Sequence, residues 1–496
     1  MLNKEIKNDS ITSIIRKNAT QNKVALIHGD EKLTYSDLLG LVDTYAGKLS
    51  YLGVKKHTKV MTLLSNGLAM TAIMLAIADI GAVLVPLNPD YKHTQISKAA
   101  IATKAEFIIH EQDLVLTQPV KQIDLRCLHD TPLRDYLATD SADDLYILTM
   151  TSGSTGEPKP ICFSQQTKID RALGAKEIYG LDSKDVILCG TPQYHSLAQR
   201  LTLLPLLIGG TCLLLERFSP KVWINEIKLN NVTFTIAVSS QLVNVLSLLE
   251  KEKPQLNSLK RIVSSSASIE EDIKDKLIKL LPCPLHECYG ASEVGTVTDF
   301  DASNQIYKVA SVGKVVSQAE VVIRDDESNP VKKNEIGEIT VKSSTSFLGY
   351  FEMLELTKKA VKDDFFYTGD LGYMDDDGYL YFKGRKKDII ISGGINIYPE
   401  DIESVVNIFK DVVESAAFPI TSSHFGEVTA VAFIAKTKVT VREIRKWCSN
   451  NLATHQVPVF FIQVEELPKT ALGKIQRNQC QSIFGSKFAE KFSFFI

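Results

Sequence analysis

The first half of the chain alternates segments of helical periodicity with short apolar runs, and this alternation limits the folds that it can adopt. Leu33 to Leu52 has helical spacing, and Val60 to Leu64 is a short apolar run. Thr71 to Ile80 is helical again, and Ala82 to Val85 has the pattern of a strand. Alternating helices and strands favour parallel sheets covered by helices, so we expect an α/β architecture.

The length of the chain and one charged cluster predict a domain boundary. A chain of 496 residues is too long for one ordinary core. A predicted hairpin around Asp377-Gly378 is followed by the cluster Gly384 to Asp388. A compact tail then begins, with a strand and a helix that opens at Pro399. We therefore expect a large N-terminal domain of layered α/β subdomains, residues 1–386, and a small mobile α+β C-terminal domain, residues 387–496.

The charge and the apolar stretches exclude several classes of partner. A net charge of -3 gives no indication of nucleic acid or acidic lipid. The start MLNKEIKNDS has no signal-peptide pattern. The longest apolar stretch, Leu201 to Leu215, is interrupted by Pro205 and Gly209-Gly210, so we expect a buried helix that leads into a strand and no integral membrane segment. Eight scattered cysteines without a CxxC pair favour a reducing cytoplasm.

The strongest chemical signal is the segment Thr151 to Lys159, which follows an apolar strand. Its glycines let backbone N–H groups approach phosphate oxygens, its hydroxyls add donors, and Lys159 adds charge. It lacks the spacing of the common P-loop. Because Ser/Thr/Gly clusters are also ordinary turns, the segment alone leaves phosphate binding and a plain turn open.

Four weaker signals follow in order along the chain. In Tyr289 to Glu293, a tyrosine can stack on a purine and a carboxylate can hold Mg²⁺. Asp370 could accept hydrogen bonds from ribose hydroxyls, and Arg385 lies at the predicted boundary. Lys474 lies in a loop near the end of the chain. Taken singly, each could be ordinary surface charge.

Together, the order and spacing of these five motifs resemble the superfamily of adenylate-forming enzymes. This superfamily includes acyl-CoA synthetases, the adenylation domains of peptide synthetases and firefly luciferase. Leu33-Thr34-Tyr35-Ser36-Asp37-Leu38 and Pro86-Leu87-Asn88-Pro89 extend the resemblance to the front of the chain. It therefore covers nearly all of the sequence, and its motifs are most similar to those of AMP-forming acyl-CoA ligases.

The resemblance implies how ATP is bound. It places Tyr289 against adenine, Ser292 near a phosphate and Glu293 on Mg²⁺, with Asp370 and Arg385 on the ribose. The residues that it assigns to nucleotide or CoA binding are Thr151, Ser152, Gly153, Ser154, Thr155, Gly156, Lys159, Tyr289, Gly290, Ala291, Ser292, Asp370, Arg385, Gly393 and Gly394.

The resemblance also implies three residues that act on the reaction. Lys474 matches the lysine that bridges the attacking carboxylate and the α-phosphate. Lys387 matches the hinge about which the small domain turns between the two half-reactions. His195 matches the gate of the acyl pocket, although a lone histidine is more often structural. Amino-acid-activating relatives usually have an aspartate there, so His195 argues against an α-amino acid substrate.

The chain departs from the family pattern in four places. Pro160 stands where glycine is usual, Ser292 where threonine is usual, and Tyr367 where arginine is usual. Ser264 to Ser268 replaces a common Gly-Gly-Ala-Pro run. None of these changes removes a charge that adenylation needs, but they leave the shape of the acyl pocket open.

We therefore predict an AMP-forming acid–thiol ligase that uses ATP and Mg²⁺ and transfers the acyl group to CoA. A carboxylate is already ionised at neutral pH, so the obstacle is the approach of one anion to another. Lys474, Lys159 and Mg²⁺ would offset that repulsion, and no Ser-His-Asp triad is needed. The first alternative is transfer to the phosphopantetheine arm of an acyl or peptidyl carrier protein. The others are a catalytically inactive binding protein and a luciferase-like oxygenase. The identity of the acid, the oligomer and the pathway stay open.

Overall fold

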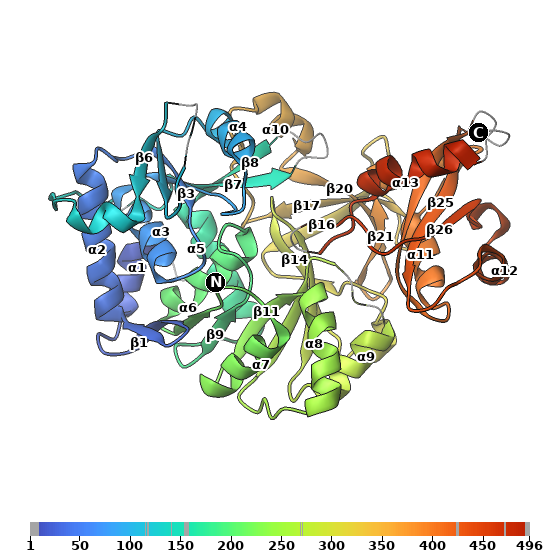
Figure 1. The fold of residues 1–496 in the computed structure, drawn as a ribbon, viewed down its shortest axis with the longest axis horizontal. Helices are drawn as coiled ribbons and strands as arrows, with labels where there is room; N and C mark the ends of the chain where they lie inside the picture. Colours follow the sequence, from blue (N-terminus) through green and yellow to red (C-terminus); the bar gives the residue numbers. More distant parts are fainter. Residues whose placement is uncertain are drawn as a thin grey trace. The chain divides into compact units, whose positions relative to one another are not determined.

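The computed structural model divides the chain into two compact units (Figure 1). The first unit comprises Met1–Val309, Gly313–Glu320 and Val341–Phe366, and the second comprises Ala310–Val312, Val321–Thr340 and Tyr367–Ile496. The structure describes residues 9–114, 116, 119–139, 141–152, 158–267, 269, 271–422, 426–470 and 473–491, without the side chains of residues 151, 152, 158, 306 and 486–491. The boundary expected after residue 386 stays a prediction.

A nine-stranded sheet forms one half of the first unit. Its strand order is β15-β14-β13-β12-β11-β9-β10-β1-β2, and its central pairs are parallel. The strands are β1 (Val24–His28), β2 (Glu31–Thr34), β9 (Val186–Cys189), β10 (Thr211–Leu214), β11 (Phe234–Val238), β12 (Arg261–Ser265), β13 (Leu285–Ala291), β14 (Gly295–Asp301) and β15 (Lys314–Val315). Helices α7 (Pro220–Leu229), α8 (Ser239–Glu252) and α9 (Glu271–Leu280) lie together beside it (Figure 1).

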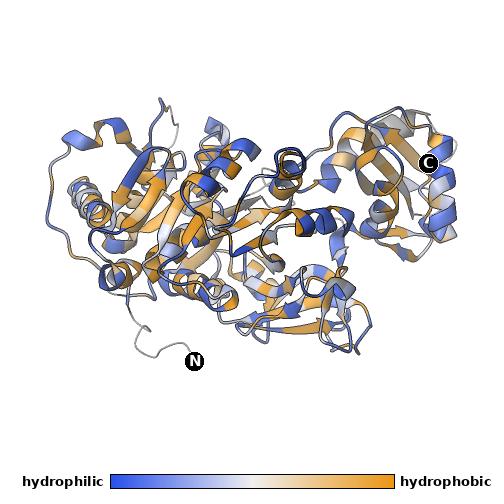
Figure 2. Ribbon diagram, turned by 90° about the horizontal axis from the view of Figure 1, so that it is seen from below, coloured by the Kyte–Doolittle hydropathy of each residue, from blue (hydrophilic) through white to orange (hydrophobic). Residues whose placement is uncertain are grey.

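A seven-stranded sheet forms the other half, in the order β18-β8-β7-β4-β3-β5-β6. Its strands are β3 (Lys59–Leu63), β4 (Val83–Pro86), β5 (Phe107–His110), β6 (Lys121–Asp124), β7 (Leu145–Ser152), β8 (Pro158–Ser164) and β18 (Gly349–Tyr350). Buried apolar residues lie along its central strands β3, β4, β5 and β7. Figure 2 colours the ribbon by hydropathy, with orange for the apolar residues that occur along many of the strands. The main core joins both sheets to α1 (Ile11–Asn18), α2 (Tyr35–Tyr51), α3 (Leu68–Ile80), α5 (Gln165–Tyr179) and α6 (Ser196–Ile208). Helices α4 (His93–Thr103) and α10 (Leu354–Ala360) complete the unit.

A third sheet has the order β16-β17-β20-β19, and β21 pairs with β20. Its strands are β16 (Ala319–Arg324), β17 (Gly337–Ser343), β19 (Val361–Lys362), β20 (Phe365–Met374) and β21 (Leu380–Arg385). The hairpin expected around Asp377-Gly378 is the connection between β20 and β21. Gly378 has a φ of 80°, which favours glycine at this turn.

The end of the chain forms a small α+β sheet with the order β23-β22-β25-β24, and β26 pairs with β25. Its strands are β22 (Ile390–Ser392), β23 (Ile395–Ile397), β24 (Val412–Ser422), β25 (Gly426–Ala435) and β26 (Phe460–Gln463). Helices α11 (Pro399–Asn407), α12 (Val441–Asn451) and α13 (Arg477–Lys491) accompany it, and α11 begins at Pro399 as expected. The layered α/β body and the α+β end confirm the predicted fold class.

The structure shows the state of the cysteines and the place of the longest apolar stretch. All eight cysteines are free, and Cys127 is the exposed one among them. The apolar stretch after Leu201 is the buried end of α6, which leads into β10. In the ranges described above, no helix is long and apolar enough to cross a membrane.

Candidate active site

The hairpin of β13 and β14 holds Tyr289 to Glu293 at one tight turn. Gly290 lies opposite Thr296, and Ala291 lies opposite Gly295. A Cβ atom on Gly290 would lie 2.1 Å from the Gly295 carbonyl oxygen, so only glycine permits this approach. The turn therefore places Ser292 and Glu293 together at the end of the hairpin.

Glu293 is oriented by Tyr350 on β18. The Tyr350 hydroxyl donates to Glu293 Oε1 at 3.0 Å. Burial, followed by the charge of Glu293, raises the pKa of Tyr350, so the phenol stays protonated and keeps donating. Among the described residues, no group of three or more potential metal-ligating side chains exists. A single carboxylate nevertheless suits Mg²⁺, because this ion usually binds one or two carboxylates together with water and substrate phosphates.

Strand β8 connects the predicted phosphate loop to this carboxylate. Thr151 pairs with Lys159 and Ser152 with Pro158 through the backbones of β7 and β8. On its other edge, β8 pairs with β18, where Tyr350 lies opposite Ile161. The predicted loop residues Gly153, Ser154, Thr155 and Gly156 lie outside the described residues. The two ends of the loop and Tyr350 therefore lie on three adjacent strands, β7, β8 and β18.

Arg171 on α5 ties the turn of β13–β14 to its surroundings, and the sequence analysis missed it. Its guanidinium donates to three main-chain oxygens, from Nη1 to Ser292 at 2.9 Å, from Nη2 to Glu293 at 3.0 Å and from Nε to Thr345 at 2.9 Å. Burial and then the charge of Arg200 lower the pKa of Arg171 to about 9. The available signal was a pair of cations, Lys168 and Arg171, one helical turn apart just after the phosphate motif.

His195 lies at the N-cap of α6, and its ring is neutral. Gln193 anchors the segment before it, because its backbone N–H donates to Asn66 at 2.7 Å and its side-chain oxygen accepts from Gly67 at 3.1 Å. Burial lowers the pKa of His195 to about 4. His195 Nε2 is buried without a hydrogen-bond partner among the residues that the structure describes. A neutral imidazole with a buried nitrogen is compatible with the expected place beside an acyl group.

In the second unit, Asp370, Arg385 and Lys474 lie close together. Asp370 on β20 pairs with Arg385 on β21, and their side chains form a salt bridge of 2.7 Å. Lys474 closes a turn in which its carbonyl oxygen accepts from the Thr470 N–H at 2.8 Å. Desolvation lowers the pKa of Lys474, Arg385 lowers it further, and Asp370 opposes both effects.

Lys387 lies between two anchored neighbours. Lys386 pairs with Asp326 at 2.9 Å and with Glu338 at 3.1 Å. Asp388 pairs with Arg477 at 3.5 Å. Lys387 itself lies in the short 3₁₀ turn Lys386–Asp388 that joins these two anchors.

The glycines Gly393 and Gly394 form the turn between β22 and β23. Their φ angles are 57° and 82°, in the region that favours glycine. A Cβ atom on Gly394 would meet nothing within 4 Å. The turn therefore has an open side, as a binding surface for a pantetheine arm requires.

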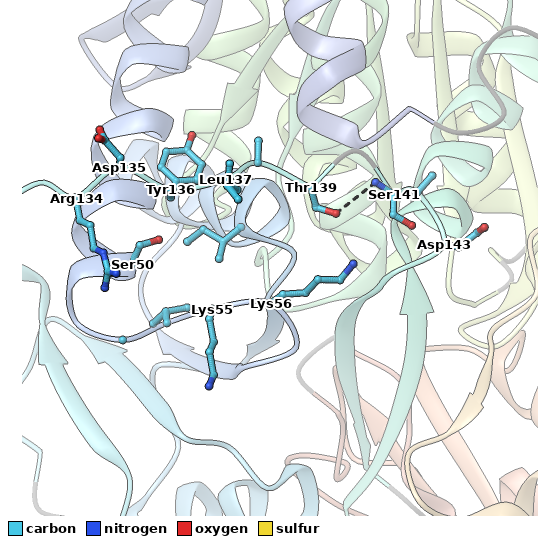
Figure 3. Close-up of a pocket in the computed structure, with 15 residues that line it drawn as sticks. Ser50, Lys55, Lys56, Arg134, Asp135, Tyr136, Leu137, Thr139, Ser141 and Asp143 are labelled. Atoms are coloured by element: carbon cyan, nitrogen blue, oxygen red, sulfur yellow. Dashed lines mark hydrogen bonds between the residues drawn. The ribbon is translucent and has the colours of Figure 1, made fainter.

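A surface hollow of about 1100 Å³ lies elsewhere on the first unit (Figure 3). It contains none of the predicted site residues. Lys56 at its edge pairs with Asp144 at 3.0 Å, and the Ser141 N–H donates to Thr139 at 3.3 Å. The residues labelled in the figure are Ser50, Lys55, Lys56, Arg134, Asp135, Tyr136, Leu137, Thr139, Ser141 and Asp143.

Two family models identify the protein family to which this site belongs. The family model of the AMP-binding enzymes matches residues 15–351, and the model of the AMP-binding enzyme C-terminal domain matches residues 401–474. The chain belongs to the AMP-binding enzyme family. Adenylate-forming chemistry, predicted from the five motifs, is thereby confirmed for this AMP-binding enzyme.

Among its relatives are ligases of one aromatic acid. A 2-succinylbenzoate–CoA ligase of Bacillus cereus (strain Q1) is 27% identical over 467 residues, which cover 94% of this chain and 96% of the relative. A 2-succinylbenzoate–CoA ligase of Bacillus licheniformis (strain ATCC 14580) is 28% identical over 472 residues, covering 94% and 98%.

Solved structures of AMP-binding enzymes share the fold. The o-succinylbenzoate CoA synthetase of Bacillus subtilis, in complex with its acyl-adenylate intermediate, aligns with a TM-score of 0.89 at 25% identity, covering 96% of this chain and 98% of that one. ATP-bound MatB from Rhodopseudomonas palustris aligns with a TM-score of 0.90 at 22% identity, covering 97% and 100%.

These findings confirm the predicted activity of the AMP-binding enzyme. It is an AMP-forming acid–CoA ligase that uses ATP to convert a carboxylic acid to an acyl-adenylate and then transfers the acyl group to CoA. ATP, Mg²⁺ and CoA are confirmed as its cofactors and co-substrates. The relatives give no support for a carrier protein as partner. The roles of individual residues stay predictions.

Proposed function

We propose that the acid activated by this ligase is 2-succinylbenzoate. The observation that carries the proposal is the likeness to 2-succinylbenzoate–CoA ligases over 94% of this chain and at least 96% of each relative. The neutral His195 adds support, because it offers no carboxylate for a substrate ammonium group. An aromatic keto acid without an amino group fits such a position.

In the proposed first step, the chain supplies positive charge and orientation. The acid attacks as a carboxylate, so the enzyme needs no general base. Lys474 and Lys159 stabilise the negative charge that develops on the phosphates. When bound, Mg²⁺ supplies further positive charge there. Glu293 would hold it, since Tyr350 orients the carboxylate and one carboxylate is enough for this ion.

In the proposed second step, the thiol of CoA attacks the mixed anhydride and AMP leaves. Asp370 and Arg385 hold the ribose, so the leaving group stays in place during attack. Gly393 and Gly394 give the pantetheine arm a path without side chains, because a Cβ atom on Gly394 would point into open space. His195 forms part of the acyl pocket as a neutral ring.

Pyrophosphate release across a panel of acids tests the substrate. The panel contains 2-succinylbenzoate, malonate, benzoate and a medium-chain fatty acid, each with and without CoA. We expect the highest kcat/KM with 2-succinylbenzoate, an acyl-adenylate without CoA and a thioester with CoA. A higher kcat/KM with another acid would refute the proposal while leaving the ligase activity intact.

We also propose that the enzyme works in the cytoplasm. Its eight cysteines are all free, and seven of them are fully or partly buried, as a reducing compartment permits. Fractionation of the source cells, followed by an activity assay, tests this location. Activity in a secreted or extracytoplasmic fraction would contradict it.

A further inference from the structure

Three cations lie close to the turn of β13–β14. Lys168 and Arg171 are buried on α5, and Arg200 lies on α6. Within the described part of the chain, none of the three forms a salt bridge with a carboxylate. A buried cation without a counter-charge is costly, so such a cluster calls for an explanation.

Neutral groups of the protein satisfy the first two cations. Lys168 Nζ donates to Gln199 Oε1 at 2.6 Å and lies 4.0 Å from the centre of the Phe163 ring. Burial, followed by the charges of Arg171 and Arg200, lowers the pKa of Lys168. Arg171 is occupied by the main-chain oxygens of the turn and of Thr345.

Arg200 is different, because part of its guanidinium is unused. Nη1 donates to Thr296 Oγ1 at 2.5 Å, which brings the side chain to β14 opposite Gly290. Nε is buried and has no hydrogen-bond partner among the described residues. A buried N–H that points at no acceptor costs free energy unless a ligand supplies one.

The helix places Arg200 beside the predicted acyl site. Ser196 and Arg200 are four residues apart in α6 and therefore lie on the same face. Ser196 Oγ lies 3.5 Å from Arg171 Nη1, so this face is turned toward the residues that position Ser292 and Glu293. His195 immediately precedes this face.

We propose that Arg200 binds the carboxylate of the acid that does not react. This inference rests on the proposed function, in which the substrate carries two carboxylates. One of them is consumed in the adenylate, and the other enters the site as an anion. A guanidinium can hold a carboxylate through two parallel hydrogen bonds, and Lys168 and Arg171 add to the positive potential around it. No described carboxylate forms a salt bridge with Arg200, so the unreacted carboxylate gives this guanidinium a direct ion pair.

Acids with one and with two carboxylates distinguish binding of the unreacted carboxylate from a role in the reaction of every acid. The test compares 2-succinylbenzoate with benzoylpropionate, which lacks the ring carboxylate, and with ortho-butyrylbenzoate, which lacks the chain carboxylate. The variant Arg200→Met should lose about 10- to 100-fold in kcat/KM for the diacid, mainly through a higher KM. The better of the two monoacids should react equally well with the variant and the wild type.

Two further variants serve as controls. Arg200→Lys keeps the charge without the planar fork, so it should recover part of the preference for the diacid. Arg217→Met removes an exposed arginine and should leave the ratio of kcat/KM between diacid and monoacid unchanged. The ratio is measured within each variant, so a partly unfolded preparation does not alter it.

The outcomes distinguish this inference from the proposed function. Equal losses for diacid and monoacid in Arg200→Met would assign Arg200 to the reacting groups or to the fold, and would overturn the inference. If the wild type rejects 2-succinylbenzoate, the proposed function fails. The inference is then tested with the pairs malonate and acetate, and phthalate and benzoate. A wild type that prefers neither diacid would overturn it as well.

Discussion

Lys474 lies near Arg385 and Asp370, and desolvation and then the charge of Arg385 lower the pKa of its ammonium group. Removing its ammonium should abolish adenylate formation and leave ATP binding nearly intact. We expect Lys474→Ala to lose on the order of 10² to 10³ in the rate of pyrophosphate exchange, because one charge contact to the transition state is lost. Chemically prepared acyl-adenylate should still be converted to the thioester by this variant.

A lysine elsewhere in the same part of the chain is the control for this substitution. Lys446 is exposed on α12, and Lys446→Ala should exchange pyrophosphate as the wild type does. If Lys474→Ala retained exchange within about threefold of the wild type, Lys474 would not be the bridging lysine.

At the scale of elements, Arg171 holds α5 against the turn of β13–β14. Arg171→Met leaves the oxygens of Ser292, Glu293 and Thr345 without their donors. We expect the free energy of unfolding, measured in urea, to fall by about 3 to 5 kcal/mol. Arg126→Met is the control, since Arg126 is exposed and pairs with Asp124 and Asp113. Equal midpoints for the two variants would show that the Arg171 contacts contribute little.

Helices α11 and α13 meet in a buried charge cluster that should make stability depend on pH. Arg477 pairs with Glu403 at 2.6 Å, Glu400 at 2.9 Å and Asp388 at 3.5 Å. Burial raises the pKa of Glu400 from 4.5 to about 7, although Arg477 opposes the shift. Between these two values, the folded protein keeps a proton that the unfolded chain releases. The free energy of unfolding should therefore fall as pH rises from about 4.5 to about 7.

Glu400→Gln should remove this contribution, which is about 1 to 3 kcal/mol. Urea unfolding at several pH values from 5 to 8 measures the slope for the variant and the wild type. Asp401→Asn changes the neighbouring residue, which pairs with Lys383 at 3.4 Å, and should keep the slope of the wild type. A slope for Glu400→Gln that equals that of the wild type would exclude Glu400 as its source.

Several elements could be predicted from local sequence, and the contacts that connect them could not. Asp377-Gly378 and Pro399 are strong local signals, so the hairpin and the start of α11 were expected correctly. Arg171 has partners more than a hundred residues away, and all of them are main-chain oxygens. Main-chain acceptors leave no trace in residue type, so the pair Lys168 and Arg171 could indicate a cationic helix face but not its partners.

At the scale of the whole molecule, the two half-reactions should depend on torsion at Lys387. Lys387→Pro fixes φ near -65° and restricts the preceding residue, so it removes freedom that a hinge needs. We expect pyrophosphate release in a single turnover to be nearly normal and thioester formation to be strongly reduced. Lys387→Ala removes the same side chain but keeps the torsion free, so it is the control.

Parallel measurement of both half-reactions decides this prediction. Equal losses in Lys387→Pro would show that residue 387 is not a hinge. The boundary proposed between residues 386 and 387 depends on the same result.

At this scale, the order of the five motifs was enough to predict the family, because the motifs extend over nearly the whole chain. The role proposed for Arg200 could not be predicted, because an arginine at this place in the sequence of α6 is typical of any helix.

The distribution of the thiols makes the enzyme accessible to spectroscopy. Among the eight cysteines, all of which lie in described residues, Cys127 is exposed, and burial raises the pKa of others such as Cys162 and Cys189. A maleimide dye should therefore react first at Cys127, in the first unit. A second dye at a cysteine introduced near α12 would then report, by energy transfer between single molecules, how far the two ends of the enzyme move during each turnover.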